Sequence, residues 1–132
     1  MKGFLTTHKG MEDIAALEVK ELIGQSPTTN ETCVIFDIKE YDGLFKLCYR
    51  SQSAIGVYCL LCEFNFSDLI EDFDKNLEKI DFGEWLSRNT QFRVKCIKNC
   101  DDSISTPEIE KKLGELIINN IQKKCNYKQK VN

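Results

Sequence analysis

Proline, glycine, histidine and long apolar runs are all scarce in this chain of 132 residues. It holds two prolines, seven glycines and one histidine, with 42% hydrophobic and 30% charged residues. This composition excludes a disordered or fibrous protein. The longest apolar run, Val57 to Cys62, is far too short to span a bilayer, and the first residues lack the apolar stretch of a signal peptide. We therefore expect a cytoplasmic protein of one or two small domains without a membrane segment.

Seven cysteines and the single histidine, His8, limit the possible metal and redox chemistry. Without an export signal, an odd number of cysteines predicts reduced thiols rather than a disulfide framework. Cys59 and Cys62 have the spacing of half a zinc site, but they fall in a predicted strand, where positions three apart face opposite sides. Cys96 and Cys100 lead out of another predicted strand. We expect buried, inert cysteines, no metal site and no catalytic Cys/His/Asp set.

Charge is unevenly divided, although the net charge is only −3. Residues 1–85 hold 8 Lys and Arg against 16 Asp and Glu, whereas residues 86–132 hold 10 against 5. Such asymmetry between halves indicates contact with an anionic partner, nucleic acid above all. On this feature alone, a solvated charged face explains the division equally well.

Apolar periodicity predicts an α+β arrangement in the first half of the chain. Strands are expected at 4–7, 32–38 and 57–64, helices at 11–22 and 41–53, and a loop at 25–31. Gly24 should end the first helix, Leu44, Leu47 and Cys48 should be buried in the second, and the strand 57–64 should be buried on both faces. The order predicts a small α+β or ferredoxin-like unit with one further short strand that the pattern does not locate.

The second half is predicted to continue with helices and one basic strand. A cap at Ser67–Asp68 predicts a helix to about residue 80, and 81–86 should form a short helix anchored by Trp85. In the strand that follows, Arg93 and Lys95 face one way and the apolar residues the other. The apolar faces of the two long helices consist of Ile70, Phe73, Leu77 and Ile80, and of Ile109, Leu113, Leu116 and Ile117.

The start of the last helix is marked in two ways, and both remain open. Either Thr106 is the N-cap and Pro107 the first helical residue, or Ser105 is the N-cap with Glu108 three residues later. In both cases backbone N–H groups beside two hydroxyls could bind a phosphate. Simple helix capping explains the same residues.

Three stretches in order resemble the N-terminal part of THUMP-containing RNA-modification enzymes, most closely the tRNA and rRNA guanine-N2-methyltransferases. They are Phe4–Glu18, Leu47–Ala54 followed by Val57, and Phe92–Lys95 together with Ser105–Glu115. The resemblance implies a ferredoxin-like domain over 1–64, followed over 65–132 by a THUMP domain without its C-terminal strands.

The same resemblance implies that these domains bind RNA, in particular the acceptor end of tRNA, and present it to a methyltransferase domain of the same protein. Lys and Arg neutralise phosphates, so binding should follow the shape of the RNA. The candidate RNA-binding residues are Arg93, Lys95, Lys98, Ser105, Thr106, Lys111 and Lys112.

The chain also departs from the family pattern. Gly56 stands where family members usually carry Arg before the valine matching Val57. The chain has no glycine-rich cofactor loop and no Asn/Asp-Pro-Pro-aromatic motif, so we expect no catalytic residue and no S-adenosylmethionine site in these residues. The resemblance implies the cofactor only for a catalytic domain outside this chain. We expect this chain to be a fragment of a longer enzyme. The alternative is a non-catalytic THUMP adaptor that presents tRNA to a separate acetyltransferase.

Overall fold

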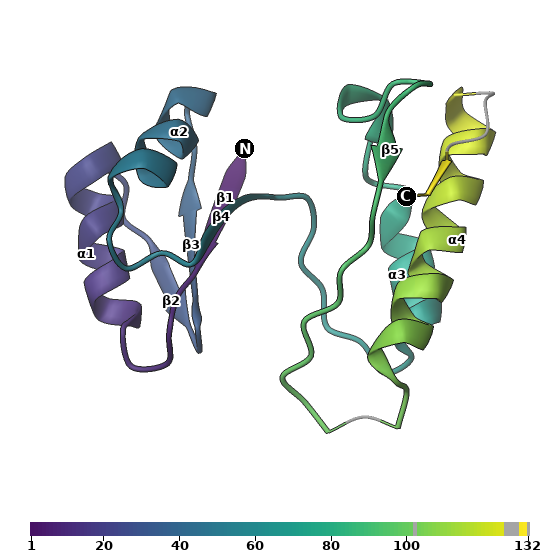
Figure 1. Cartoon of the computed structure of the whole chain (residues 1–132), viewed down its shortest axis with the longest axis horizontal. Coiled ribbons are helices and arrows are strands. Elements are labelled where there is room, and N and C mark those ends of the chain that lie inside the picture. Colours follow the sequence, from purple (N-terminus) through teal and green to yellow (C-terminus); the bar gives the residue numbers. More distant parts are fainter. Residues whose placement is uncertain (102, 126–129, 132) are drawn as a thin grey trace. The chain divides into compact units, whose positions relative to one another are not determined.

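The computed structural model describes residues 1–101, 103–125 and 130–131. The chain divides into two compact units, unit 1 (residues 1–63) and unit 2 (residues 64–132), and Figure 1 labels most of their elements. Helices and a small antiparallel sheet make it an α+β protein, as the sequence predicts. Among the described residues, no helix has both the length and the apolar character needed to cross a membrane.

Unit 1 is a four-stranded antiparallel sheet with two helices on one face. Its elements are β1 (Lys2–Thr6), α1 (Glu12–Ile23), β2 (Thr28–Asn30), β3 (Cys33–Asp37), α2 (Tyr41–Arg50) and β4 (Gly56–Leu60). The strands lie in the order β2-β3-β1-β4, with every pairing antiparallel. Both helices lie on the same side of the sheet (Figure 1), so the sheet buries that face in the core.

The core of unit 1 lies between this face of the sheet and the two helices. Alternate positions of the central strands point toward the helices because successive side chains of a strand face opposite sides. The buried cluster consists of Leu5, Ala15, Val19, Val34, Phe36, Ile38, Leu44 and Leu47. The prediction that Leu44 and Leu47 are buried is confirmed. Cys48 is exposed, since it follows Leu47 by one position, about 100° around the helix.

Three features of unit 1 correct the sequence prediction. β2 lies inside the predicted loop, where Thr-Thr-Asn shows no apolar alternation. α2 ends at Arg50 rather than at residue 53. β4 ends at Leu60, and it is not buried on both faces because the helices cover only one face of the sheet. Tyr58 is 44% exposed and stacks on Phe4 of the neighbouring strand, with ring centroids 4.9 Å apart.

The cysteines are less buried than expected. Five are half-buried, and Cys48 and Cys100 are exposed. Cys62 lies beyond the end of β4, so the argument that it faces away from Cys59 across a strand does not apply. Burial raises the pKa of the Cys33 and Cys59 thiols, which keeps both protonated and unreactive at neutral pH.

Unit 2 is built on two packed helices. Its elements are α3 (Leu69–Leu77), the 3-10 helix η1 (Phe82–Glu84), β5 (Gln91–Phe92), α4 (Thr106–Cys125) and β6 (Lys130–Val131), with β5 and β6 paired in parallel. Asp68 caps α3, since its carboxylate accepts the Glu71 N–H at 3.1 Å. Helices α3 and α4 contact each other. The buried side chains of this unit are Leu77, Ile80, Phe82, Ile109, Ile117 and Ile121.

Two predictions in unit 2 are corrected. The short helix is a single 3-10 turn, and its buried residue is Phe82, which is 8% exposed, rather than Trp85, which is 38% exposed. Among the described residues, the predicted strand that carries Arg93 and Lys95 is paired at Gln91 and Phe92 and not beyond them. Its alternation continues beyond the pairing, because Val94 is half-buried while Arg93 and Lys95 are exposed. The pattern therefore predicted the exposed face correctly but not the extent of the strand.

Candidate nucleic-acid interface

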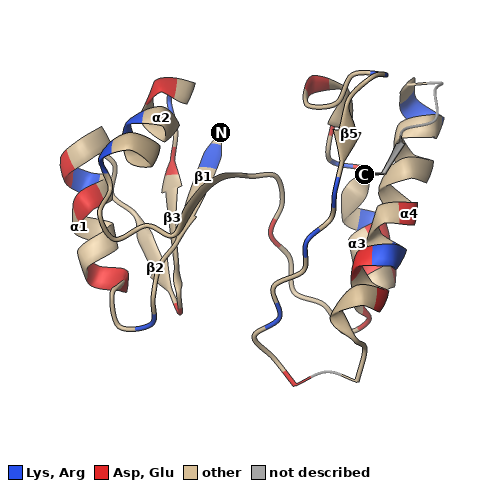
Figure 2. Ribbon diagram, viewed as in Figure 1, with Lys and Arg blue, Asp and Glu red and all other residues tan. Residues whose placement is uncertain are grey.

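The segment that leads from β5 to α4 (residues 93–105, called the basic segment below) presents cationic side chains at the surface. Figure 2 shows Lys and Arg positions spaced along it. The segment is attached to α4, since the Cys96 N–H donates to Glu110 Oε1 at 2.9 Å. With the half-buried side chains on the inner side, Arg93 and Lys95 are left exposed. The hydrogen bond at Cys96 thus attaches the segment to α4 while both cationic side chains stay at the surface.

The predicted cations fall into two groups. Lys112 forms an ion pair with Glu108 at 3.0 Å, and Lys98 Nζ donates to the Ile104 carbonyl at 2.9 Å. In contrast, Arg93, Lys95 and Lys111 have no ion-pair partner in the part of the chain that the structure describes.

The start of α4 is placed by its backbone hydrogen bonds. The Ile109 N–H donates to the Ser105 carbonyl at 3.0 Å, which puts Ser105 at the N-cap position and Thr106 at the first helical position. The structure therefore favours the second of the two predicted alternatives. Glu108, however, is directed to Lys112 at 3.0 Å. Ser105 is exposed and Thr106 half-buried.

Two of the predicted residues meet at one groove. Arg93 from the basic segment and Lys111 from α4 line an open groove of about 380 Å³, which lies along α4. The other lining residues are Val94, Pro107, Glu110, Gly114, Glu115 and Ile118. Lys95, Lys98, Ser105, Thr106 and Lys112 do not line it. Sequence reasoning missed Gly114, although an isolated glycine inside a helical pattern is a signal of a packing or functional role.

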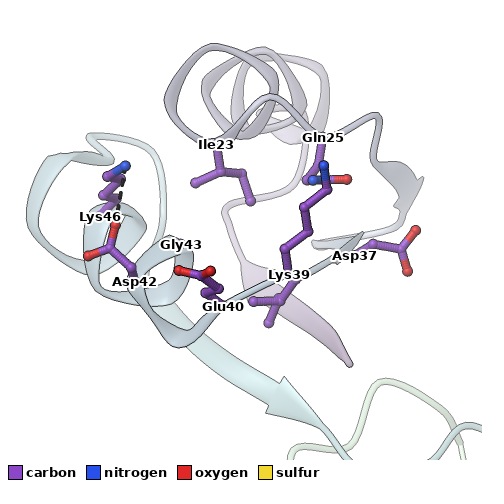
Figure 3. A pocket seen from close by; sticks show the side chains of 9 residues that line it. Ile23, Gln25, Asp37, Lys39, Glu40, Asp42, Gly43 and Lys46 are labelled. Atoms are coloured by element: carbon purple, nitrogen blue, oxygen red, sulfur yellow. Dashed lines mark ion pairs between the residues drawn. The ribbon is translucent and has the colours of Figure 1, made fainter.

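A second hollow, of about 250 Å³, lies in unit 1 between the end of α1, the end of β3 and the start of α2. It carries three carboxylates, from Asp37, Glu40 and Asp42, and Asp42 pairs with Lys46 at 3.2 Å. Figure 3 shows the Asp37 side chain pointing away from the other two. Within the described ranges, no group of three or more His, Cys, Asp or Glu residues could hold a metal ion. The carboxylates here are therefore spread over the rim rather than gathered around one point.

Glu18 in unit 1 has a strongly shifted pKa, and the cause is structural. Burial acts to raise the pKa, but hydrogen bonds from Ser51, Ser53 and the Gln52 backbone outweigh it and lower the pKa to about 2. Glu18 Oε2 accepts both serine hydroxyls at 2.5 Å, and Glu18 Oε1 accepts the Gln52 N–H at 3.0 Å. A carboxylate so fully bonded serves to join α1 to the turn after α2.

The sequence comparison gives one curated relative. The chain is 24% identical over 134 residues to the tRNA (guanine(6)-N2)-methyltransferase of Methanocaldococcus jannaschii. The match covers 100% of this chain and 35% of that protein, so the chain spans about a third of its relative. No family model matches the chain. The resemblance to tRNA guanine-N2-methyltransferases is confirmed as a relationship in sequence.

Solved structures share the fold. A predicted N6-adenine-specific DNA methylase from Listeria monocytogenes superposes with a TM-score of 0.80 at 19% identity, over 95% of this chain and 32% of that one. A possible methylase from Clostridium difficile 630 gives a TM-score of 0.81 at 19% identity, over 98% and 35%. The chain again matches about a third of a longer polypeptide.

Proposed function

We propose that this chain is the RNA-binding part of an S-adenosylmethionine-dependent RNA guanine-N2-methyltransferase, and that it binds the acceptor end of tRNA for a methyltransferase domain in the same protein. The observation that carries this proposal is the match of the whole chain to about a third of a tRNA (guanine(6)-N2)-methyltransferase. The match supports a methyltransferase rather than an adaptor for a separate acetyltransferase.

In this proposal unit 1 is the ferredoxin-like domain and unit 2 belongs to a THUMP domain. The order β-α-β-β-α-β in unit 1, with strand order β2-β3-β1-β4, supports the first assignment. Methyl transfer belongs to the other domain, because the seven glycines of this chain are isolated from one another and build no cofactor loop. The residues described here supply contacts to RNA.

The contact surface in unit 2 is formed by Arg93, Lys95 and Lys111, the candidate cations that have no ion-pair partner among the described residues. Each can neutralise one phosphate of the RNA backbone, and the counterions released drive binding. Contacts of this kind hold the backbone in register without reading bases. Binding should therefore follow RNA shape and weaken steeply as salt increases.

The test is charge reversal at Arg93 and Lys95. Arg93→Glu with Lys95→Glu should weaken binding to a tRNA acceptor-stem hairpin roughly tenfold or more, and should reduce the log–log salt slope by about 1 to 2. Fluorescence anisotropy at low salt gives the affinities. Both side chains are exposed, so the fold should be retained.

The matched control is Lys75→Glu with Lys79→Glu in the same unit. It makes the same change in net charge, and it removes only an exposed ion pair of Lys75 with Glu71, which contributes little to stability. This control should bind RNA nearly as wild type does. An equal loss in both double variants, or no loss in either, would contradict the proposal.

A further inference from the structure

The sheet of unit 1 ends in two edge strands of opposite character. In the order β2-β3-β1-β4, the outer strands are β2 and β4. β2 is three polar residues long (Thr28–Asn30), and the residue after it, Glu31, forms an ion pair with Lys9 at 2.8 Å. A short polar edge beside charged residues resists pairing with another strand. β4 has five residues, Gly56–Leu60, none of them charged and none of them proline, so this edge lacks those protections.

The uncharged character extends along the chain on both sides of β4. Residues 51–62 contain no Asp, Glu, Lys or Arg, whereas residues 1–63 as a whole hold 6 Lys and Arg and 9 Asp and Glu. Among the described residues, β4 pairs with β1 and with no other strand. A strand that is paired on one side only presents N–H and C=O groups on the other side, where a further strand can be added.

Three aromatic residues of α2 form a stripe beside this edge. Tyr41, Phe45 and Tyr49 follow one another at intervals of four residues, so they share one side of the helix. Their side chains are 52%, 59% and 89% exposed. Below, this set is called the aromatic stripe. Exposed aromatic residues in a row are unusual on a surface that only contacts water, because burying them is strongly favourable.

The aromatic stripe lies on the flank of α2 that faces away from α1. Gly43 marks the flank next to α1, since a Cβ there would lie 3.7 Å from Ile23 of that helix. Cys48, on the opposite flank, lines a hollow of about 180 Å³ together with Val57 of β4. The first two residues of the stripe lie within about 60° of Cys48 around the helix. The stripe and the edge of β4 are therefore on the same side of unit 1.

We propose that two copies of this chain pair through β4 and α2 about a two-fold axis. Each copy supplies the same edge, and the two four-stranded sheets become one antiparallel sheet of eight strands. Helix α2 packs over both Gly3 of β1 and strand β4. Since strands lie about 4.8 Å apart, the two α2 helices then lie about 10 Å apart, which is the distance at which helices pack. The two aromatic stripes meet across the axis.

Charge favours a second copy as the occupant of this surface. Two copies of an acidic unit repel each other unless they meet where charge is absent or neutralised. The edge of β4 carries no charge, and Asp42 and Lys46 of α2 neutralise each other in an ion pair at 3.2 Å. The polar β2 edges stay at the two ends of the joined sheet, so assembly stops at two copies. An interface of this limited extent gives a weak dimer.

The experiment is sedimentation equilibrium of the full 132-residue chain under reducing conditions, which keep the cysteines from forming disulfides. As the protein concentration rises from the micromolar to the millimolar range, the weight-average mass should rise from one chain mass toward two and no further. Phe45→Lys should raise the dissociation constant of the dimer roughly tenfold or more, because each copy would place a charge in the interface.

The matched control is Leu17→Lys in α1. Leu17 is also 59% exposed, and the change adds the same charge to the same unit on the other helix. It should leave dimerisation as in wild type, and melting curves of both variants establish that they are folded. Equal weakening by both changes, or none by Phe45→Lys, overturns the inference.

A pair of charge variants tests the strand. In the register that pairs all five residues of β4, Tyr58 lies opposite Tyr58 of the second copy, because the strand is antiparallel to its copy. Tyr58→Lys and Tyr58→Glu, at a position 44% exposed, should each be monomeric where wild type dimerises, since like charges then lie opposite each other. An equimolar mixture should recover a dimer with one copy of each, because Lys then lies opposite Glu.

The remaining outcomes contradict the inference. Folded Tyr58 variants that dimerise alone, or that stay monomeric when mixed, exclude two-fold pairing of β4. A wild-type chain that is monomeric up to millimolar concentration overturns the inference, and the edge would then serve another domain or a different protein. Masses beyond two chains exclude closure at a dimer. RNA binding is tested separately by Arg93→Glu with Lys95→Glu in unit 2, so either proposal can fail while the other stands.

Discussion

Glu18 shows how a single carboxylate can hold two elements together. It lies on α1 and accepts hydrogen bonds from Ser51, Gln52 and Ser53, which form the turn between α2 and β4. The helix α2 ends at Arg50: the Ser51 N–H still donates to the Leu47 carbonyl, but the N–H groups of Gln52 and Ser53 donate to Glu18 instead of continuing the helix. Hydrogen bonds to a charged acceptor are among the stronger ones in proteins.

The change Glu18→Gln should destabilise unit 1 by roughly 1 to 3 kcal/mol at pH 7, because the amide has one acceptor oxygen and brings its own donors against N–H groups. The folded-state pKa of Glu18 is lowered from 4.5 to about 2. Its stabilisation is therefore full above about pH 5 and is lost as the pH falls toward 2. Urea unfolding at a series of pH values should show the difference between wild type and variant shrinking over that range.

Glu21→Gln is the control for this series, since Glu21 is an exposed residue of the same helix. It should have little effect at any pH. A difference between Glu18→Gln and wild type that stays constant from pH 7 to pH 2 would show that the charge on Glu18 does not stabilise the turn.

The candidate cations show which part of the site can be read from a sequence. The alternation around Val94 was sufficient to predict that Arg93 and Lys95 are exposed. The pairing of Lys112 with Glu108 also follows from their spacing of four residues in a helix. The meeting of Arg93 with Lys111 could not be predicted, because it depends on how the basic segment lies along α4. That placement comes from the hydrogen bond of Cys96 to Glu110.

At the scale of elements, the long helices were predictable and the short strands were not. α1 and α4 have several turns of apolar periodicity and marked ends at Gly24 and Pro107. β2 is three polar residues long, and a strand of this length exists only because β3 lies beside it. β5 has two paired residues. Strand pairing depends on a partner distant in sequence, which local periodicity does not contain.

Helices α3 and α4 are joined where α3 ends. Lys124 Nζ of α4 donates to the carbonyls of Glu78 and Ile80 at 2.8 and 3.1 Å. The Asn120 side-chain amide donates to the Leu77 carbonyl at 3.4 Å. The Glu78 carbonyl lies at the C-cap of α3 and the Ile80 carbonyl just beyond it, and a cation is favourable at a helix C-terminus.

The change Lys124→Met should therefore destabilise unit 2 by roughly 1 to 2 kcal/mol, because it keeps the apolar stem but removes the donor to two carbonyls. Lys123→Met, at the exposed neighbouring position, should cost much less. Urea unfolding followed by tryptophan fluorescence measures both variants. Equal stability of the two would show that water replaces the Lys124 hydrogen bonds without loss.

At the scale of the whole molecule, charge is divided in the way that the proposed RNA contact requires. The acidic residues predominate in residues 1–85 and the basic residues in residues 86–132, where the groove and the candidate cations Arg93, Lys95 and Lys111 lie. A net charge of −3 would disfavour RNA if it were spread evenly. Local concentration of cations lets an acidic chain attract phosphate at one surface.

The chain by itself should neither bind S-adenosylmethionine nor transfer a methyl group to RNA. The physical reason is that its isolated glycines give no loop through which a backbone could closely approach a cofactor. Isothermal titration of the 132-residue chain with S-adenosylmethionine should give no saturable heat. Saturable binding in the micromolar range would contradict the assignment of the cofactor to another domain.

Trp85, beside the 3-10 helix of unit 2, is the only tryptophan in the chain. Excitation at wavelengths beyond tyrosine absorption therefore reports optically on unit 2 alone, while circular dichroism of the backbone reports on both units. A side chain that is 38% exposed should shift its emission to the red when η1 unfolds. The molecule thus contains an intrinsic probe, and the two signals followed in one titration show whether its halves melt as one cooperative body or as two.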